Sequence, residues 1–139
     1  WVASNTEVAD ILRDYRDYTM ICAGVFDDMV ATLVLENKEA ILKRNRQIVE
    51  ENLALMDAWI AKEPKASWVR PASVSTSFVK LDVNRPIEDF ALELLQDYGV
   101  LVVPGNRFDK ESHVRIGYCC DKEVLQKGLE KLSQFLNKC

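Results

Sequence analysis

The sequence predicts a fold of the α/β class, with a helical first half and an α+β second half. Two observations carry this prediction. Apolar residues recur at helical spacing through the first 62 residues, whereas the stretch after Pro71 reads as strand, helix, strand, strand and helix. We therefore expect the second half to form a small, mainly antiparallel sheet covered by helices.

The composition is that of an ordinary globular domain. Of the 139 residues, 48% are hydrophobic and 29% are charged, which is enough to bury a core. The net charge is −4, so the chain lacks the excess of basic residues that is typical of a nucleic-acid-binding protein. No apolar run reaches the roughly 18 residues of a membrane span, and no signal-peptide pattern is present. We expect a cytoplasmic protein without a nucleic-acid or membrane partner.

The cysteines and the single histidine, His113, limit the kinds of metal site that the chain can form. No two cysteines form a CxxC pair. Adjacent side chains on a strand point to opposite faces, so Cys119 and Cys120 do not suit one metal ion. We expect no metal site, and free thiols that a reducing cytoplasm keeps unpaired.

The first 36 residues predict a short strand and two helices. The chain begins abruptly on apolar residues over Trp1–Ser4, as if in the middle of a strand. Asn5 or Thr6 is suited to cap a helix that runs to about Tyr15. A second helix is expected over residues 25–35, where two aspartates in the first turn match the helix dipole.

The strongest periodic signal predicts one long helix from Asn37 to about Lys62. Two apolar series repeat every seven residues along it, which indicates an amphipathic helix of about seven turns. Pro64 ends this helix. Asn52 lies beside the apolar stripe, so we expect this face to meet a partly polar surface. The two series are Ile41, Ile48 and Leu55, and Leu42, Val49 and Met56.

After Pro71 the pattern becomes that of strands and short helices. Residues 73–82 alternate and predict a strand. A helix opens at Pro86 and ends at Gly99, the usual positions of these residues. The further segments that we expect are a short buried strand over 100–103, a polar loop over 106–112, a strand over 113–120 and a helix from Asp121 to Leu136.

Arg115 is the candidate site residue. It lies between Val114 and Ile116 in an apolar strand, and alternation places it on the face opposite to both. A guanidinium in a cleft requires an anionic partner and pairs bidentately with a carboxylate. The alternatives are an exposed edge arginine and an internal ion pair. Lys80 is expected to be a solvated lysine, and His113 is expected to be a surface or edge histidine.

Two segments carry a resemblance to a known family, Val103-Pro-Gly-Asn-Arg-Phe and His113-Val-Arg-Ile-Gly-Tyr. They resemble the fold-type-I enzymes that depend on pyridoxal phosphate (PLP), specifically the class I/II aminotransferases. That family has a strand ending in Pro-Gly, a phenylalanine, a loop and an apolar-Arg-apolar strand. The long and the last helix resemble family elements too. The matching residues are Pro104, Gly105, Phe108 and Arg115.

The resemblance implies an amino-acid aminotransferase that moves an α-amino group to a 2-oxo acid. Arg115 would bind the α-carboxylate of the substrate. The lysine that holds PLP would precede Trp1, so the resemblance implies no catalytic and no cofactor-binding residue in this chain. This segment would therefore be inactive alone. Amino acids and 2-oxo acids would be its substrates, and the full-length protein would be a homodimer.

The resemblance also implies a domain organisation. Residues 1–36 would end the large PLP-binding domain, residues 37–63 would form the connecting helix, and residues 64–139 would form the small C-terminal domain. The chain opens without methionine, and we expect the native protein to continue upstream. Two departures from the family concern substrate access: Asp109 stands where glycine is frequent, and residues 71–74 stand where a Gly-Gly pair is frequent.

Other functions stay open on the sequence. Another PLP reaction on the same fold, such as that of a β-lyase, a decarboxylase or an oxidase, would use the same arginine, because its α-amino-acid substrates share the carboxylate. A non-catalytic, aminotransferase-like ligand-sensing domain is a further alternative, as is an unrelated α+β domain with a chance match. A fold by itself does not choose between these functions.

Overall fold

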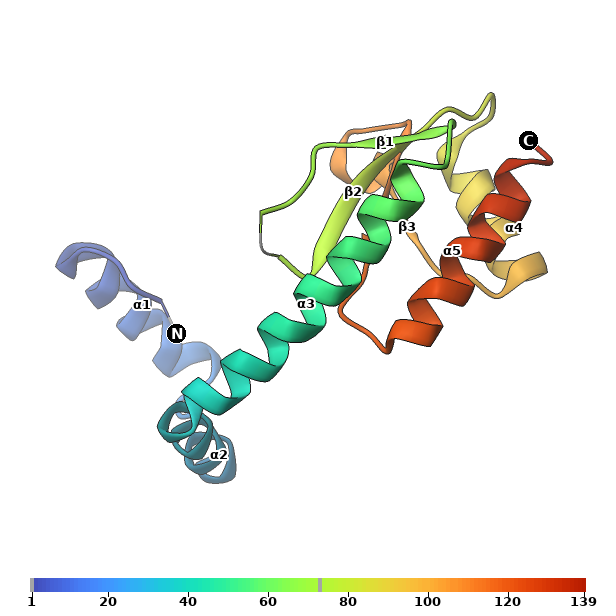
Figure 1. Cartoon of the computed structure of the whole chain (residues 1–139). Helices are drawn as coiled ribbons and strands as arrows, with labels where there is room; N and C mark the ends of the chain where they lie inside the picture. Colours follow the sequence, from blue (N-terminus) through green and yellow to red (C-terminus); the bar gives the residue numbers. More distant parts are fainter. Residues whose placement is uncertain (1, 73) are drawn as a thin grey trace. The chain divides into compact units, whose positions relative to one another are not determined.

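The computed structural model describes residues 2–72 and 74–139 (Figure 1). The expectations that concern Trp1 and Ser73 lie outside these residues. The chain divides into two compact units, residues 1–42 and 43–139, and each is described by itself. The long predicted helix is present as α3 (Lys38–Ile60), which begins in the first unit and ends in the second.

The first unit contains α1 (Thr6–Thr19), α2 (Val25–Glu36) and the beginning of α3. Asn5 caps α1 as predicted, because its side-chain oxygen accepts the N–H of Val8 at 3.0 Å. The expected strand at the start of the chain is wrong for its described part, since Val2–Ser4 has no regular secondary structure. Neither α1 nor α2 contains a buried residue.

The second unit is built on a sheet of short strands: β1 (Ala66–Trp68), β2 (Thr76–Leu81), β3 (Val103–Pro104) and β4 (His113–Gly117). The four strands lie in the order β1-β2-β4-β3, and all neighbours are antiparallel. The prediction of a small antiparallel sheet is confirmed. β1 has no counterpart among the predicted elements, because three residues are too few to show an alternation.

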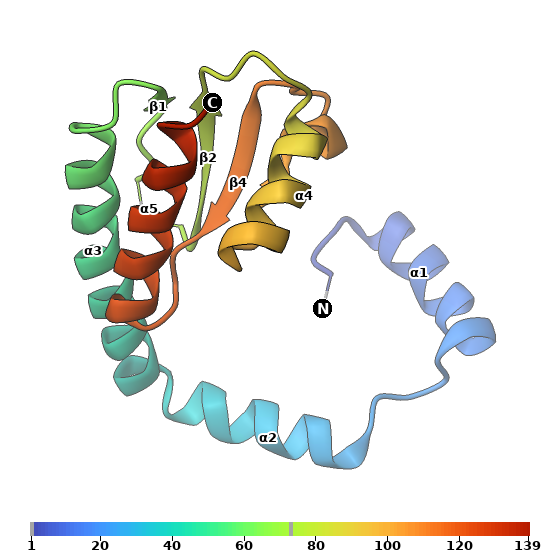
Figure 2. The ribbon, with the colours of Figure 1, turned by 90° about the vertical axis from the view of Figure 1, so that its right-hand side faces the viewer.

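Helices cover one face of this sheet. Figure 2 shows α4 (Ile87–Tyr98), α5 (Lys122–Leu136) and the later part of α3 on one side of β2 and β4. Val79 and Val114 lie on the covered face and are 0% exposed. The core cluster joins all three helices to the strands, with Leu53 and Met56 from α3, Phe90 and Leu94 from α4, and Leu132 and Leu136 from α5.

The helix ends of this unit follow the cap predictions. Gly99 ends α4 in the left-handed conformation, with φ of 65°, and Asp121 accepts a backbone N–H at the start of α5. Asn52 of α3 is 2% exposed and donates to the backbone oxygens of Tyr118 and Cys120, at 2.7 and 2.8 Å. The polar surface expected beside the long helix is therefore the backbone that follows β4.

Three strands are shorter than predicted, among them β2, which spans Thr76–Leu81. β3 contains only Val103–Pro104, and Leu101 is 75% exposed, so the expected buried strand over residues 100–103 is wrong. β3 lies at the edge of the sheet and pairs with β4 at two positions only. β4 ends at Gly117, earlier than expected, because the backbone after it turns to bind Asn52.

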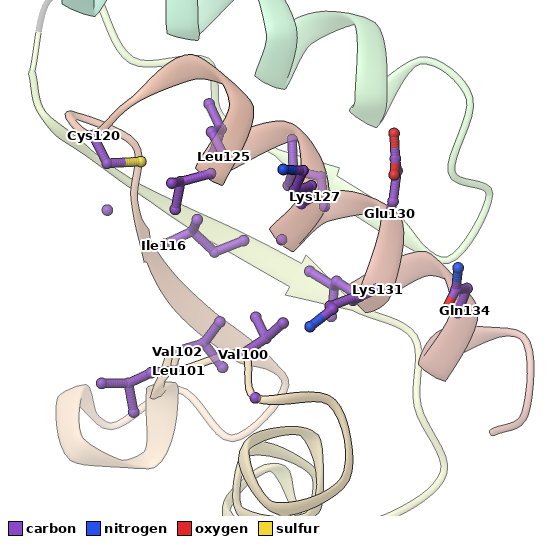
Figure 3. A pocket seen from close by; sticks show the side chains of 16 residues that line it. Val100, Leu101, Val102, Ile116, Cys120, Leu125, Lys127, Glu130, Lys131 and Gln134 are labelled. Carbon is purple, nitrogen blue, oxygen red and sulfur yellow. The ribbon is translucent and has the colours of Figure 1, made fainter.

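A groove of about 540 Å³ lies between α5 and the segment before β3 (Figure 3). Its walls are mainly apolar and include Val100, Val102, Leu125 and Ile116. Ile116 belongs to the covered face of the sheet, so the groove opens on that side. Within residues 2–72 and 74–139, no helix is long and apolar enough to cross a bilayer, and no three metal-binding side chains cluster.

Candidate functional site

Arg115 emerges from the open face of the sheet, opposite to the helices. Its neighbours Val114 and Ile116 are 0% and 7% exposed on the covered face, whereas Arg115 is exposed. The predicted alternation is confirmed. Across the β2–β4 ladder, Arg115 lies directly opposite Phe78. The guanidinium therefore rises beside an aromatic side chain of the neighbouring strand.

The guanidinium of Arg115 has an aromatic neighbour and no carboxylate partner among the described residues. None of the ion pairs that these residues form includes Arg115. Its Cζ lies 5.4 Å from the centroid of the Phe108 ring, a cation–π distance. The described structure thus offers no support for the alternative of an internal ion pair. Its donors remain available to a carboxylate from outside.

Three aromatic rings form a continuous platform beside Arg115. The Phe108 ring meets the Phe78 ring edge-on at 5.8 Å between centroids, and Phe78 stacks on His113 at 4.9 Å. His113 is half-buried in this stack and lies on β4, which pairs with both β2 and β3. Burial lowers the pKa of His113, and the charges of Lys110 and Lys80 lower it further. The imidazole therefore favours its neutral form.

The loop that carries Phe108 is fixed by a glycine. Gly105–Phe108, which runs from the Pro-Gly turn into the predicted polar loop, forms a 3-10 helix, η1. Gly105 is buried, and a Cβ at this position would overlap the backbone oxygens of Lys110 and His113. The oxygen of Gly105 accepts the N–H of Lys110 at 3.0 Å, which closes the loop. The Pro-Gly turn is therefore required by close backbone packing.

Glu88 binds the same loop from the first turn of α4. Its Oε2 accepts a hydrogen bond from Nδ2 of Asn106 at 2.7 Å, and its Oε1 accepts one from Nη2 of Arg107. The Oδ1 of Asn106 is buried without a hydrogen-bond partner among the described residues. Just after η1, Asp109 takes a left-handed φ of 56°. The loop is thus strained at one end and held by a carboxylate.

The chemistry that this face supports is the binding of a carboxylate. A guanidinium offers two parallel donors that match the two oxygens of a carboxylate. The ring of Phe108 covers one side of the guanidinium and restricts its orientation. Lys80 lies on the same face, exposed as predicted, and no nucleophile–base pair accompanies Arg115 among the described residues. The arrangement suits recognition of a ligand rather than proton transfer.

Sequence patterns located some of these residues and missed others. Of the residues in the Pro-Gly, Phe and Arg motif, Phe108 lies against Arg115, whereas Pro104 pairs with Val114 and Gly105 closes the loop. The contacts of Phe78, His113 and Glu88 were not predicted. Alternation could place Phe78 on the face of Lys80, but only the register with β4 brings it opposite Arg115. The large groove of Figure 3 has no part in this site, because it opens on the other face.

A family model described as "Aminotransferase class I and II" matches residues 1–132 of the chain. The chain belongs to this family. The architecture agrees: a PLP-dependent aminotransferase from Streptococcus suis 89-1591 superposes with a TM-score of 0.94 and 64% identity over 99% of this chain and 37% of that one. The fold-type-I architecture implied by the resemblance is therefore confirmed.

Curated relatives are more distant. Capreomycidine synthase of Streptomyces vinaceus is 26% identical over 137 residues, which is 98% of this chain and 35% of that protein. A probable N-acetyl-LL-diaminopimelate aminotransferase of Bacillus subtilis is 26% identical over 141 residues, which is 95% of this chain and 34% of that protein. The chain thus spans about a third of the length of these relatives.

Family membership implies PLP as the cofactor of the full-length enzyme. A PLP site requires a lysine for the cofactor aldehyde and donors for its phosphate. On the face of Arg115, the lysine of β2 is Lys80, whose side chain is exposed on the strand. The platform beside it is aromatic. The residues of this face fit a carboxylate and do not by themselves fit PLP.

Proposed function

We propose that this chain is the C-terminal part of a PLP-dependent amino-acid aminotransferase and that Arg115 binds the α-carboxylate of its substrates. The supporting observation is the exposed guanidinium, which has no carboxylate partner among the described residues and is flanked by Phe108. Both the amino acid and the 2-oxo acid carry a carboxylate next to the reacting carbon. One arginine can therefore position both substrates.

The domain organisation forms part of the proposal. Residues 1–36 form the C-terminal end of the large PLP-binding domain, residues 37–63 form the helix that connects the two domains, and residues 64–139 form the small domain. We further propose a cytoplasmic homodimer that binds neither nucleic acid nor membrane. Size-exclusion chromatography with light scattering on the full-length protein tests the dimer. A monomer that is fully active would contradict it.

The carboxylate role is tested by Arg115→Met in the PLP-loaded holoenzyme. Loss of a charge-assisted, bidentate contact is expected to raise KM for the amino donor and the 2-oxo acid by about ten- to hundredfold. Lys80→Met is the matched control, because it removes another exposed cation from the same face. Its KM values should stay within about twofold. Equal effects of the two substitutions would refute the assignment to Arg115.

A second candidate is another PLP reaction on the same fold. It is favoured by the capreomycidine synthase relative, whose name is not that of an aminotransferase. Product analysis separates the two. A transaminase consumes one 2-oxo acid for each amino acid converted and shows ping-pong kinetics. Turnover of an amino acid without any 2-oxo acid would favour the second candidate.

A further inference from the structure

The carboxylate that binds the loop is anchored on a rigid part of α4. Ile87, next to Glu88, is 1% exposed, and Phe90 is 0% exposed one turn further on. Both fix the first turn of the helix against the core. A negative charge in this turn also matches the positive end of the helix dipole. Glu88 therefore offers a fixed reference point to whatever binds it.

Both oxygens of Glu88 are used by consecutive residues of η1. Asn106 donates a hydrogen bond to Oε2, and Arg107 donates one to Oε1. Phe108 is the next residue along the chain. These two contacts restrain the loop from the side of α4. The next residue, Asp109, has a left-handed φ of 56°. Residues other than glycine seldom adopt this conformation, although aspartate does so more often than most. Such a conformation persists where its surroundings hold it.

The loop in turn determines what lies against Arg115. Phe108 contacts both Arg115 and Phe78, at 5.4 Å and 5.8 Å to the ring centroids. A long arginine side chain on an open face has many rotamers. The ring removes those rotamers that would cross it. A continuous series of contacts thus runs from Glu88 through η1 and Phe108 to the guanidinium.

We propose that Glu88 is a positioning residue for the carboxylate site: it holds η1 so that Phe108 orients Arg115. This inference rests on the proposed function of Arg115. Glu88 forms its ion pair with Arg107 and not with Arg115, so it acts on the Arg115 guanidinium through the loop. The expected consequence of its loss is a weaker grip on the substrate carboxylate while the fold of the domain is kept.

A neighbouring ion pair provides the matched control. Glu93 lies on the same helix and pairs with Arg85 at 2.6 Å. The two glutamates are similarly exposed, with side-chain exposures of 49% for Glu88 and 41% for Glu93, whereas Arg85 at 30% is more buried than Arg107 at 62%. Exposed ion pairs add little to stability in general. Any effect that Glu88→Gln shows and Glu93→Gln does not is therefore specific to the loop.

Hydrogen exchange in the holoenzyme measures the restraint on the loop. In Glu88→Gln, the amide of Lys110, which closes the loop on Gly105, is expected to exchange at least about fivefold faster than in the wild type. Glu93→Gln should leave this rate unchanged. Unaltered exchange in Glu88→Gln would overturn the proposal, because Glu88 would then not hold η1.

Steady-state kinetics measures the consequence for the substrate. Glu88→Gln is expected to raise KM for the amino donor by about three- to tenfold, the range that one hydrogen bond commonly supplies, with kcat within about twofold. In combination with Arg107→Met the effects should not add, because both substitutions break the same contact. An unchanged KM, or a fall in kcat alone, would overturn the proposal.

Failure of the inference and failure of the proposed function give different results. If Arg115→Met raises KM and Glu88→Gln does not, only the positioning role is wrong. If Arg115→Met has no effect on KM, the carboxylate site itself is wrong, and the positioning role falls with it. Faster exchange in Glu88→Gln without any change in KM would mean that the loop does not orient Arg115.

Discussion

The two faces of the sheet carry different side chains on the same strands. On the covered face, Val79 and Val114 are fully buried. On the open face, their sequence neighbours Phe78 and Arg115 lie directly opposite each other. Successive side chains along β2 and β4 alternate between the covered face and the face of the candidate site. The contrast teaches that the same alternation that builds the core also sets out the ligand-binding face.

This difference separates stability from binding. Substitutions on the covered face should change the free energy of unfolding, whereas substitutions on the open face should change the affinity for a carboxylate. Neighbouring residues on one strand provide the sharpest test, since they differ in face and share everything else.

Val79→Asp should break the covered face. An uncompensated carboxylate at a fully buried position is expected to cost more than about 3 kcal/mol. Lys80→Asp, one residue further along, should change the free energy of unfolding by less than about 0.5 kcal/mol, because Lys80 is exposed. Urea unfolding measures both. Should Val79→Asp fail to fold, Val79→Ala gives a measurable loss of about 1–3 kcal/mol. Equal losses at residues 79 and 80 would contradict the contrast.

Asn52→Leu tests the contact that ends β4. Two backbone oxygens would lose the donor that now satisfies them, at a cost of about 1–3 kcal/mol in the free energy of unfolding. Asn45→Leu, at an exposed position on the same helix, is the control and should be close to neutral. Thermal unfolding distinguishes the two. A neutral Asn52→Leu would mean that these oxygens find other donors.

Phe108→Leu should sharpen the contrast from the open face. It removes the ring that orients Arg115, and the cost of ordering one free side chain on binding is about 0.5–1 kcal/mol, so KM for the amino donor should rise by about two- to fivefold. The free energy of unfolding should fall by no more than about 1 kcal/mol, the size of an exposed cation–π contact, because Phe108 is 45% exposed. Kinetics and urea unfolding of one preparation test both statements. A stability loss without a change in KM would assign Phe108 to the core instead.

The pH dependence of His113 is the smallest expected effect. Burial lowers its pKa in the folded protein, so between the ordinary and the lowered value the unfolded chain binds more protons than the folded one. The contribution of this residue to stability is thus present above the ordinary pKa of about 6.5 and is lost as the pH falls below it. His113→Gln should flatten this part of the stability–pH curve. Identical slopes of variant and wild type would contradict the prediction.

Local patterns were sufficient for most of the second unit. Gly99 and Asp121 end and begin helices where their conformational and hydrogen-bonding preferences place them. The short elements were the failures. β1 and β3 contain three and two residues, and pairing partners rather than propensity decide whether such segments become strands.

The candidate site was predictable in its arginine and not in its surroundings. The position of Arg115 follows from alternation, which acts between adjacent residues and can be read from the chain. The opposition of Phe78 and Arg115 depends on the register between strands, which are separated by α4 and η1. Register is decided by the burial of a whole face at once, and the sequence of one strand does not contain it.

The sequence by itself determined the class of the fold, the position of the caps and the face on which Arg115 lies, because these depend on local geometry and on the periodicity of apolar residues. Only the tertiary structure decided that Glu88 would meet Asn106 and Arg107, since α4 and η1 come together through the packing of α4 on the sheet. Contacts between distant segments arise from the collective burial of the core, and no local pattern encodes them.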